Sequence, residues 1–186
     1  MIKTATGKDP LPSAAVQLAA IAELLALADS VRAPVWLRGG WAMDFHLGRV
    51  TRPHTDIDWF ARTADLPRLL PLLVDAGFDD VTTAAAGQQV DLVRDGVEHG
   101  IALINVSTGE AAVTVAGGPF AGEPWPEGMI NGSLGRLGEL TVPIISPASQ
   151  IEIKQHMPTW NPGLARRQKD LDDIEALRVS LGEVID

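Results

Sequence analysis

Two aspartates one residue apart, Asp56 and Asp58, are the residues of this 186-residue sequence best placed to do chemistry. They fall in the stretch DIDWFA, where Ile57 and Trp59 alternate with them as along a β-strand. Because successive side chains of a strand point to opposite faces, both carboxylates belong to one face, about 6 to 7 Å apart at the backbone. Hard cations such as Mg²⁺ prefer oxygen ligands and complete their shells with water and substrate phosphates. The pair therefore predicts a magnesium site that works with a nucleoside triphosphate.

A pair of glycines, Gly39 and Gly40, lies a short distance before the aspartates. Backbone without side chains lets N–H groups approach phosphate oxygens at the start of a helix, which is expected near Trp41. Basic side chains between the glycines and the aspartates would offset the charge of the triphosphate and stabilise the leaving pyrophosphate. These are Arg49, Arg52 and His54.

The run LRGGWAMDFHLGRVTRPHTDID, residues 37–58, resembles the signature of the aminoglycoside and lincosamide nucleotidyltransferases, within the DNA polymerase β-like nucleotidyltransferase superfamily. That signature consists of Gly-Gly-Trp-Ala, an Asp, Leu-Gly-Arg, Thr-Arg, His and Asp-x-Asp, and each element is present. A weaker similarity follows at Lys154 and at the run Arg167-Gln-Lys169-Asp170, which resemble the family's lysine and one of its helix starts.

The resemblance implies an α+β nucleotidyltransferase fold, with a small mixed β-sheet flanked by helices and further helices at the C-terminal end. It implies Mg²⁺, ATP or another nucleoside triphosphate as donor, and transfer of a nucleoside monophosphate, AMP in the first instance, to a hydroxyl of a small molecule. An aminoglycoside- or lincosamide-type antibiotic is the implied acceptor. Asp56 and Asp58 become catalytic metal ligands, and the implied nucleotide-binding residues are Gly39, Gly40, Asp44, Arg49, Arg52, His54 and Lys154.

The third carboxylate that family members usually carry on a neighbouring strand is where this sequence departs from the pattern. A β-hairpin is predicted over 88–107, with its turn at Asp95-Gly96. Its second strand carries Glu98 as the carboxylate on the relevant face, so Glu98 is the expected third catalytic residue, either as a metal ligand or as the base that deprotonates the acceptor. Asp91 on the first strand is the alternative. If neither reaches the site, the chain is a weak enzyme or a silent protein that binds its ligand without turnover.

The elements that must position these residues follow from periodicity and turn signals, with Ser13 as the expected N-cap of the first helix. Residues 1–110 are expected to form the nucleotidyltransferase core. Residues 111–186 are expected to add a β/loop extension, rich in Gly and Pro, and the C-terminal helices, all packed as one compact unit. Helices are predicted over 12–30, 41–48, 66–77, 147–160 and 164–182, and strands over 35–37, 55–61, 88–107 (the hairpin) and 111–117.

Composition narrows the possible functions further. The sequence has no cysteine, which excludes disulfides, thiolate nucleophiles and Cys-ligated metals. It shows no signal peptide and no apolar run of the ~18 residues that a membrane span needs, which predicts a cytoplasmic protein without a membrane partner. The net charge of −9 argues against nucleic acid as a partner.

The acidic surplus is uneven, because residues 32–62 hold five arginines against three aspartates. The rest of the chain is therefore more acidic than the whole, as recognition of a polycationic acceptor such as an aminoglycoside would require. A protein partner as the modified substrate is a further alternative. The sequence is compatible with a monomer or a homodimer.

Overall fold

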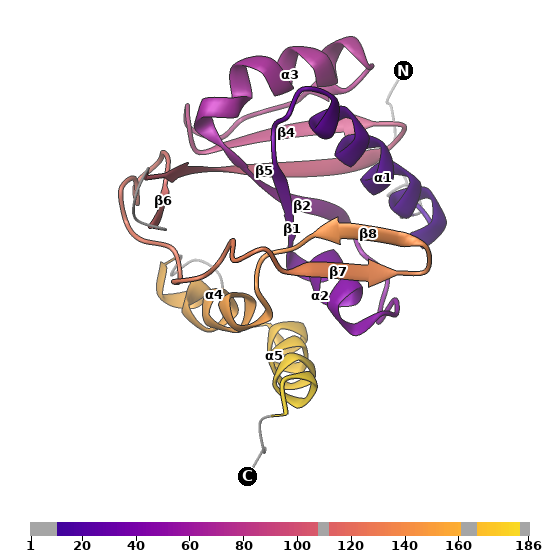
Figure 1. The fold of residues 1–186 in the computed structure, drawn as a ribbon, viewed down its shortest axis with the longest axis vertical. Helices are drawn as coiled ribbons and strands as arrows, with labels where there is room; N and C mark the ends of the chain where they lie inside the picture. The colour runs from indigo at the N-terminus through magenta and orange to yellow at the C-terminus, as the bar shows by residue number, and fades with distance from the viewer. Residues whose placement is uncertain (1–10, 108–111, 161–166, 183–186) are drawn as a thin grey trace, which may run out of the picture.

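The computed structural model describes residues 11–107, 112–160 and 167–182, and a six-stranded sheet lies at its centre (Figure 1). The strands follow the order β1-β2-β5-β4-β3, and β6 pairs with β5. The β2–β5 pair is parallel and the other pairs are antiparallel, which makes the sheet mixed, as predicted. The strands are β1 (Val35–Arg38), β2 (Asp56–Arg62), β3 (Asp79–Asp80), β4 (Gln89–Arg94), β5 (Val97–Val106) and β6 (Val113–Val115).

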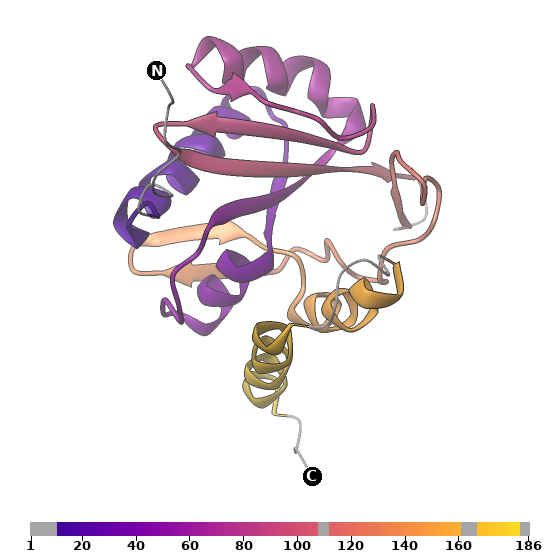
Figure 2. The ribbon, with the colours of Figure 1, turned by 180° about the vertical axis from the view of Figure 1, so that it is seen from behind.

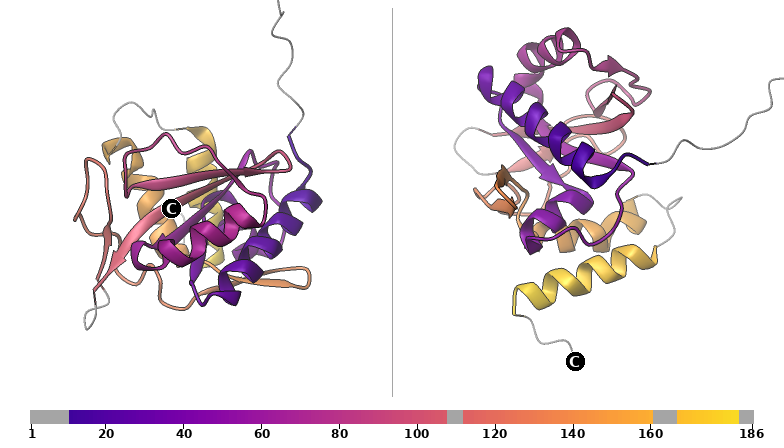
Figure 3. Two further views of the ribbon diagram at one scale, coloured as in Figure 1. Left: turned by 90° about the horizontal axis from the view of Figure 1, so that it is seen from above. Right: turned by 90° about the vertical axis from the view of Figure 1, so that its right-hand side faces the viewer.

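One face of the sheet packs against α1 (Ala14–Ser30) and α3 (Leu66–Asp75), whereas α4 (Pro147–Trp160) and α5 (Gln168–Ser180) lie on the other side (Figure 3). Helix α1 begins as predicted, because the Ser13 side chain accepts a hydrogen bond from the Val16 N–H at 3.4 Å. Ile57, Trp59 and Ile101 point into this helix-covered core and are fully buried. The alternation predicted for β2 is therefore confirmed.

The opposite face is covered at one end only. There, Phe60 and Ile104 of the sheet pack with Met129 and Ile145, and with Ile153 of α4. In both Figure 1 and Figure 2, α4 and α5 lie far from α3. The part of this face that carries Asp56 and Asp58 is thus left open. The predicted boundary between 1–110 and 111–186 falls outside the described residues, but this second core joins residues from both sides of it.

Three elements differ from the sequence-based expectation. Helix α2 (Gly39–Leu47) starts at the first glycine rather than near Trp41, because Gly39 has φ +69° and lets the chain turn directly from β1 into the helix. β3 was not predicted as a strand, and the brief strands expected in the β/loop extension had no predicted bounds, since segments this short show no periodic pattern. In the structure, β7 (Leu134–Leu137) and β8 (Leu140–Pro143) form a hairpin there. The predicted start of the last helix falls outside the described residues. In the described part of the chain, no helix has the length and apolar character to cross a membrane.

His99 is a buried titratable side chain on the helix-covered face. Its Nδ1 accepts a hydrogen bond from Trp59 Nε1 at 3.3 Å, and its ring meets Phe78 edge to face. Because an indole N–H only donates, the neutral imidazole carries its own hydrogen on Nε2. Burial lowers the pKa of His99 to about 4.

Acid is therefore expected to destabilise the fold through His99. The unfolded chain binds a proton below about pH 6.5, whereas the folded chain resists it down to about pH 4. The free energy of unfolding is thus expected to fall by up to about 3 kcal/mol from pH 6.5 to pH 4 on this account. The free energy of unfolding, measured with denaturant at several pH values in this range, should fall less steeply with decreasing pH for His99→Leu than for wild type. Equal slopes would remove His99 as the cause.

Candidate active site

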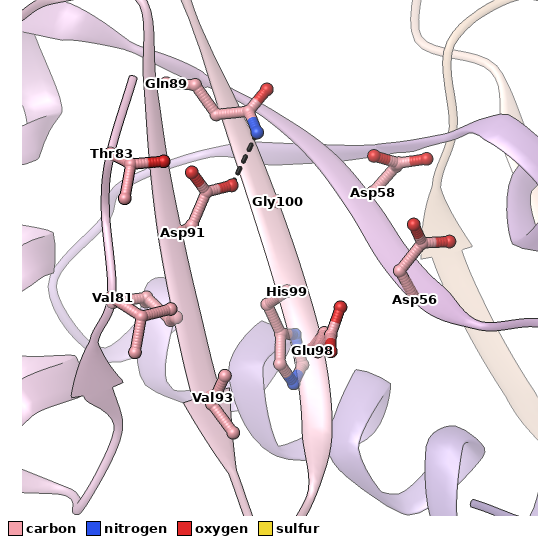
Figure 4. A pocket seen from close by; sticks show the side chains of 11 residues that line it. Asp56, Asp58, Val81, Thr83, Gln89, Asp91, Val93, Glu98, His99 and Gly100 are labelled. Atoms are coloured by element: carbon pink, nitrogen blue, oxygen red, sulfur yellow. Dashed lines mark hydrogen bonds between the residues drawn. The ribbon is translucent and has the colours of Figure 1, made fainter. Parts of the chain in front are cut away.

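The aspartate pair lines a cleft of about 300 Å³ on the open face of the sheet (Figure 4). Asp56 is exposed and Asp58 is partly buried, and both come from the start of β2. In the sheet register, Asp58 pairs with Arg38 of β1 on one side and with Gly100 of β5 on the other. Four carboxylates line the cleft, those of Asp56, Asp58, Asp91 and Glu98. Among the described residues, no Lys or Arg lines it.

The two glycines are required by close packing at the first turn of α2. A β-carbon at position 39 would lie 2.7 Å from Asp58 Oδ2, and one at position 40 would lie 2.5 Å from His54 Nδ1. Both distances are too short for any side chain, and Gly39 also has a positive φ. The glycines therefore bring the helix start directly against Asp58 and let the His54 ring pack beneath it.

Arg38 is a site residue that the sequence analysis missed. Its Nη2 donates to Asp58 Oδ1 at 3.1 Å, and its guanidinium lies 5.1 Å from the centre of the Phe60 ring. Only the register of β1 against β2 brings these residues together. Arg38 thus places a fixed positive charge beside the carboxylate pair, where the charge of a triphosphate would also be met.

Asp44 and His54 form a buried unit behind the helix start. Asp44 is fully buried and accepts hydrogen bonds from His54 Nε2 at 2.6 Å, Thr51 Oγ1 at 2.5 Å and the Thr51 N–H at 3.2 Å. The 51–54 segment is therefore fastened to α2. Contact of Asp44 and His54 with a nucleotide stays a prediction. In this structure, both side chains stabilise the turn behind the start of α2.

Arg52 and Lys154 converge on one carboxylate of α5. Arg52 Nη2 and Lys154 Nζ each donate to Asp173 Oδ2 at 2.7 Å, and Asp173 is itself buried. Lys154 Nζ also lies 3.6 Å from Asp170 Oδ1. Burial acts to raise the pKa of Asp170, but the hydrogen bond from Arg167 and the positive charge of Lys154 outweigh it, so the pKa is lowered. Partly buried cations need counter-charges, so these acids hold Arg52 and Lys154 close to the helix start. Asp173 is the second residue that sequence analysis missed.

The remaining predicted residues separate into two groups. Arg49 is exposed, and its backbone N–H donates to the Asp44 carbonyl. Glu98 is exposed on β5 and pairs in register with Asp56, whereas Asp91 on β4 pairs with Gly100. Both candidate third carboxylates thus line the cleft, Glu98 directly beside Asp56 and Asp91 one strand further from Asp58, beyond Gly100.

The donor set fits a hard cation with an incomplete protein shell. Asp56 and Asp58 offer carboxylate oxygens to the open cleft. Among the described residues, no three His, Asp or Glu side chains are grouped closely enough to hold an ion together. Mg²⁺ commonly takes one or two carboxylates plus substrate phosphates. The residues present therefore fit an ion that binds together with a nucleotide.

A mixed sheet with an Asp-x-Asp pair facing an acidic cleft, beside a helix that starts on two glycines, defines a protein of the nucleotidyltransferase fold. The chain belongs to the aminoglycoside-2''-adenylyltransferase family, whose profile matches residues 20–177. The predicted family and fold class are thereby confirmed.

Individual relatives agree with this assignment. A 2''-aminoglycoside nucleotidyltransferase of Klebsiella pneumoniae is 55% identical over 42 residues, which are 23% of this chain, and one of Escherichia coli matches equally well. The matched segment spans about a quarter of those relatives' length, 24%.

Solved structures agree over most of the chain. ANT(2'')-Ia in complex with adenylyl-2''-tobramycin superimposes with a TM-score of 0.74 at 22% identity, covering 90% of both chains. The lincosamide adenylyltransferase LnuA, bound to lincomycin, gives 0.66 at 21% identity, covering 85% of this chain and 94% of its own. At these identities the likeness concerns the fold.

Proposed function

We propose that this protein transfers an adenylyl group from ATP, with Mg²⁺, to a hydroxyl of an aminoglycoside antibiotic. Membership of the family and the activities of its relatives support the reaction type. The observation that carries the proposal is the position of Asp56 and Asp58, side by side on an open acidic cleft against the start of α2. The reaction is proposed to take place in the cytoplasm, and the enzyme is proposed to be a monomer or a homodimer.

The carboxylates and the glycines of the site each have a task in this reaction that their geometry supports. Asp56 and Asp58 would hold Mg²⁺, which when bound neutralises triphosphate charge and polarises the reacting oxygens. The backbone N–H groups at Gly39 and Gly40 would meet phosphate oxygens at the start of α2.

The basic residues around the helix start complete the phosphate side of the site. Arg38 lies beside Asp58, and Arg52 and Lys154 are held near the same helix start through Asp173. They would meet charge that develops on the pyrophosphate as it leaves. Arg49 and His54 are proposed to help bind the nucleotide, and Asp44 to act on it through His54.

The charge of the cleft favours a cationic acceptor over a neutral one. Its lining holds four carboxylates, and two of them, Asp91 and Glu98, lie beyond the pair proposed to bind metal. Ammonium groups of an aminoglycoside would be attracted into this field, and their association should weaken as salt rises. A lincosamide carries less positive charge and is the second acceptor to test.

The assay combines the protein with Mg²⁺, α-labelled ATP and a panel of aminoglycosides and lincosamides. We expect pyrophosphate release only when an aminoglycoside is present, and a product heavier than the acceptor by one adenylyl group. Binding of ATP without turnover on any acceptor would point to a silent relative instead. Labelling of a protein in a lysate, with no antibiotic modified, would point to a macromolecular substrate. Either result would overturn the proposal.

A further inference from the structure

Gly100 has no side chain and therefore leaves a gap on the face of the sheet between two carboxylates. In the register of β2, β5 and β4, Asp58 and Asp91 are the two neighbours of Gly100. A β-carbon at position 100 would lie 3.3 Å from Asp58 Oδ1, 3.4 Å from Gln89 Nε2 and 3.8 Å from Asp91 Oδ1. The two carboxylates therefore lie on either side of the space above Gly100, and the Gln89 amide borders the same space, as Figure 4 shows.

Asp91 is held in this orientation by its neighbours. Gln89 Nε2 donates to Asp91 Oδ1 at 2.5 Å, the dashed contact of Figure 4. The backbone of Asp91 is fixed as well, because its N–H donates to Thr82 Oγ1 at 2.9 Å and its carbonyl accepts from the Val81 N–H. One carboxylate oxygen is thus engaged in a hydrogen bond within the protein, on a side chain that is partly buried and lines the cleft.

Glu98 is placed differently. It shares a row of the sheet with Asp56 and Val93, one step nearer the hairpin turn, and its side chain is exposed. Its neighbours in the sheet are Asp56 and Val93, so it has no glycine gap beside it like the one between Asp91 and Asp58. Its longer side chain also has more rotamers to restrict. A base must be held within hydrogen-bond reach of the proton that it takes. By position and by restraint, Asp91 meets this requirement better than Glu98.

We infer that Asp91, acting across the gap at Gly100, is the third catalytic carboxylate of this protein and accepts the proton of the acceptor hydroxyl. The inference rests on the proposed adenylyl transfer. In the step, the acceptor O–H bond breaks and its proton passes to the Asp91 carboxylate. The acceptor oxygen bonds to the α-phosphorus of ATP, and the bond from that phosphorus to the bridging oxygen breaks, so pyrophosphate leaves with the electron pair.

The first test compares Asp91→Asn with Glu98→Gln, which remove the same charge from the same cleft. We expect Asp91→Asn to lower kcat by about 10²-fold or more, the scale of a positioned base. Glu98→Gln should change kcat by less than about tenfold and act mainly on the KM of the cationic acceptor. Calorimetric titration of ATP and of acceptor, with thermal melting, should show that Asp91→Asn still folds and binds both.

The second test moves the carboxylate. In the double variant Asp91→Asn/Gly100→Asp, the carboxylate returns to the same space from β5, and we expect kcat to recover by at least tenfold over Asp91→Asn. The matched variant Asp91→Asn/Gly100→Ala adds a β-carbon without a carboxylate and should not recover. This recovery would not follow from a merely structural role of Asp91.

The outcomes separate this inference from the function on which it rests. Wild-type turnover together with an unchanged kcat in Asp91→Asn, or an equal or larger loss in Glu98→Gln, would overturn the role of Asp91 and leave adenylyl transfer standing. Failure of Gly100→Asp to restore a folded, ligand-binding Asp91→Asn variant would also overturn it. A folded wild type without acceptor-dependent pyrophosphate release would overturn both.

Discussion

Asp58→Asn is expected to lower the rate of the proposed adenylyl transfer by about 10³-fold or more while leaving the chain folded. Asp58 lies at the meeting point of the site, between Arg38 of β1 and the gap at Gly100, and against the start of α2 at Gly39. An amide in its place keeps the shape but loses the negative charge that a metal ion bound with the triphosphate needs. The partly exposed ion pair with Arg38 contributes at most about 1 kcal/mol to stability, so the fold should survive.

The matched control is Asp95→Asn, which makes the same chemical change at the far end of the hairpin. Asp95 is exposed in the turn between β4 and β5 and has φ +51°, a conformation that asparagine tolerates well. We expect its kcat to equal that of wild type within a factor of about two. Titration with Mn²⁺ in the presence of a non-hydrolysable ATP analogue should show weaker ion binding in Asp58→Asn alone. A kcat for Asp58→Asn within tenfold of wild type would contradict the assignment of this aspartate as a metal ligand.

Local signals in the sequence predict much of this fold. Alternation fixes the two faces of β2, so that Asp56 and Asp58 share one face while Ile57 and Trp59 are buried on the other. Ser13 marks the start of α1 and Asp95-Gly96 marks the hairpin turn, because caps and tight turns require particular residue types. These features depend on neighbours in the chain, and neighbours are visible in a single sequence.

What the sequence does not predict depends on distant pairing. Asp173 accepts from both Arg52 and Lys154, three residues on three different segments, and no spacing rule joins them. Likewise, only the register of β4 against β5 places Asp91 across Gly100 from Asp58. The sequence predicts that the basic residues bind phosphate, yet Arg52 and Lys154 already form ion pairs with Asp173 in the structure. A cation near a protein core requires a counter-charge whether or not a ligand is bound.

The signature run itself gains a physical explanation from these contacts. Gly40 leaves room for the His54 ring, His54 donates to Asp44, and Asp44 also holds Thr51. Each element of the run thus packs against another one in it. The spacing of the signature reflects this internal packing as well as any contact with a nucleotide.

The largest expected effect on stability follows from that packing. Asp44→Asn should lower the free energy of unfolding by about 3 kcal/mol, because the carboxylate is fully buried and accepts three hydrogen bonds. An amide can satisfy fewer of these donors and turns its own NH₂ group toward one of them. Denaturant unfolding measures the loss, and Asp29→Asn, an exposed change on α1, should stay within about 0.5 kcal/mol of wild type.

A double-mutant cycle distinguishes the buried unit from a general loss of packing. Asp44 and His54 touch through a 2.6 Å hydrogen bond, so Asp44→Asn and His54→Asn should be less damaging together than the sum of their separate losses, by at least about 1 kcal/mol. Pairing Asp44→Asn with Asp29→Asn should give additive losses. Because the His54 ring packs at Gly40, the Asp44→Asn variant should also bind ATP more weakly even where it remains folded. Additive losses for Asp44 and His54, or a loss below about 1 kcal/mol for Asp44→Asn, would show that the turn beneath the helix start does not depend on this buried carboxylate.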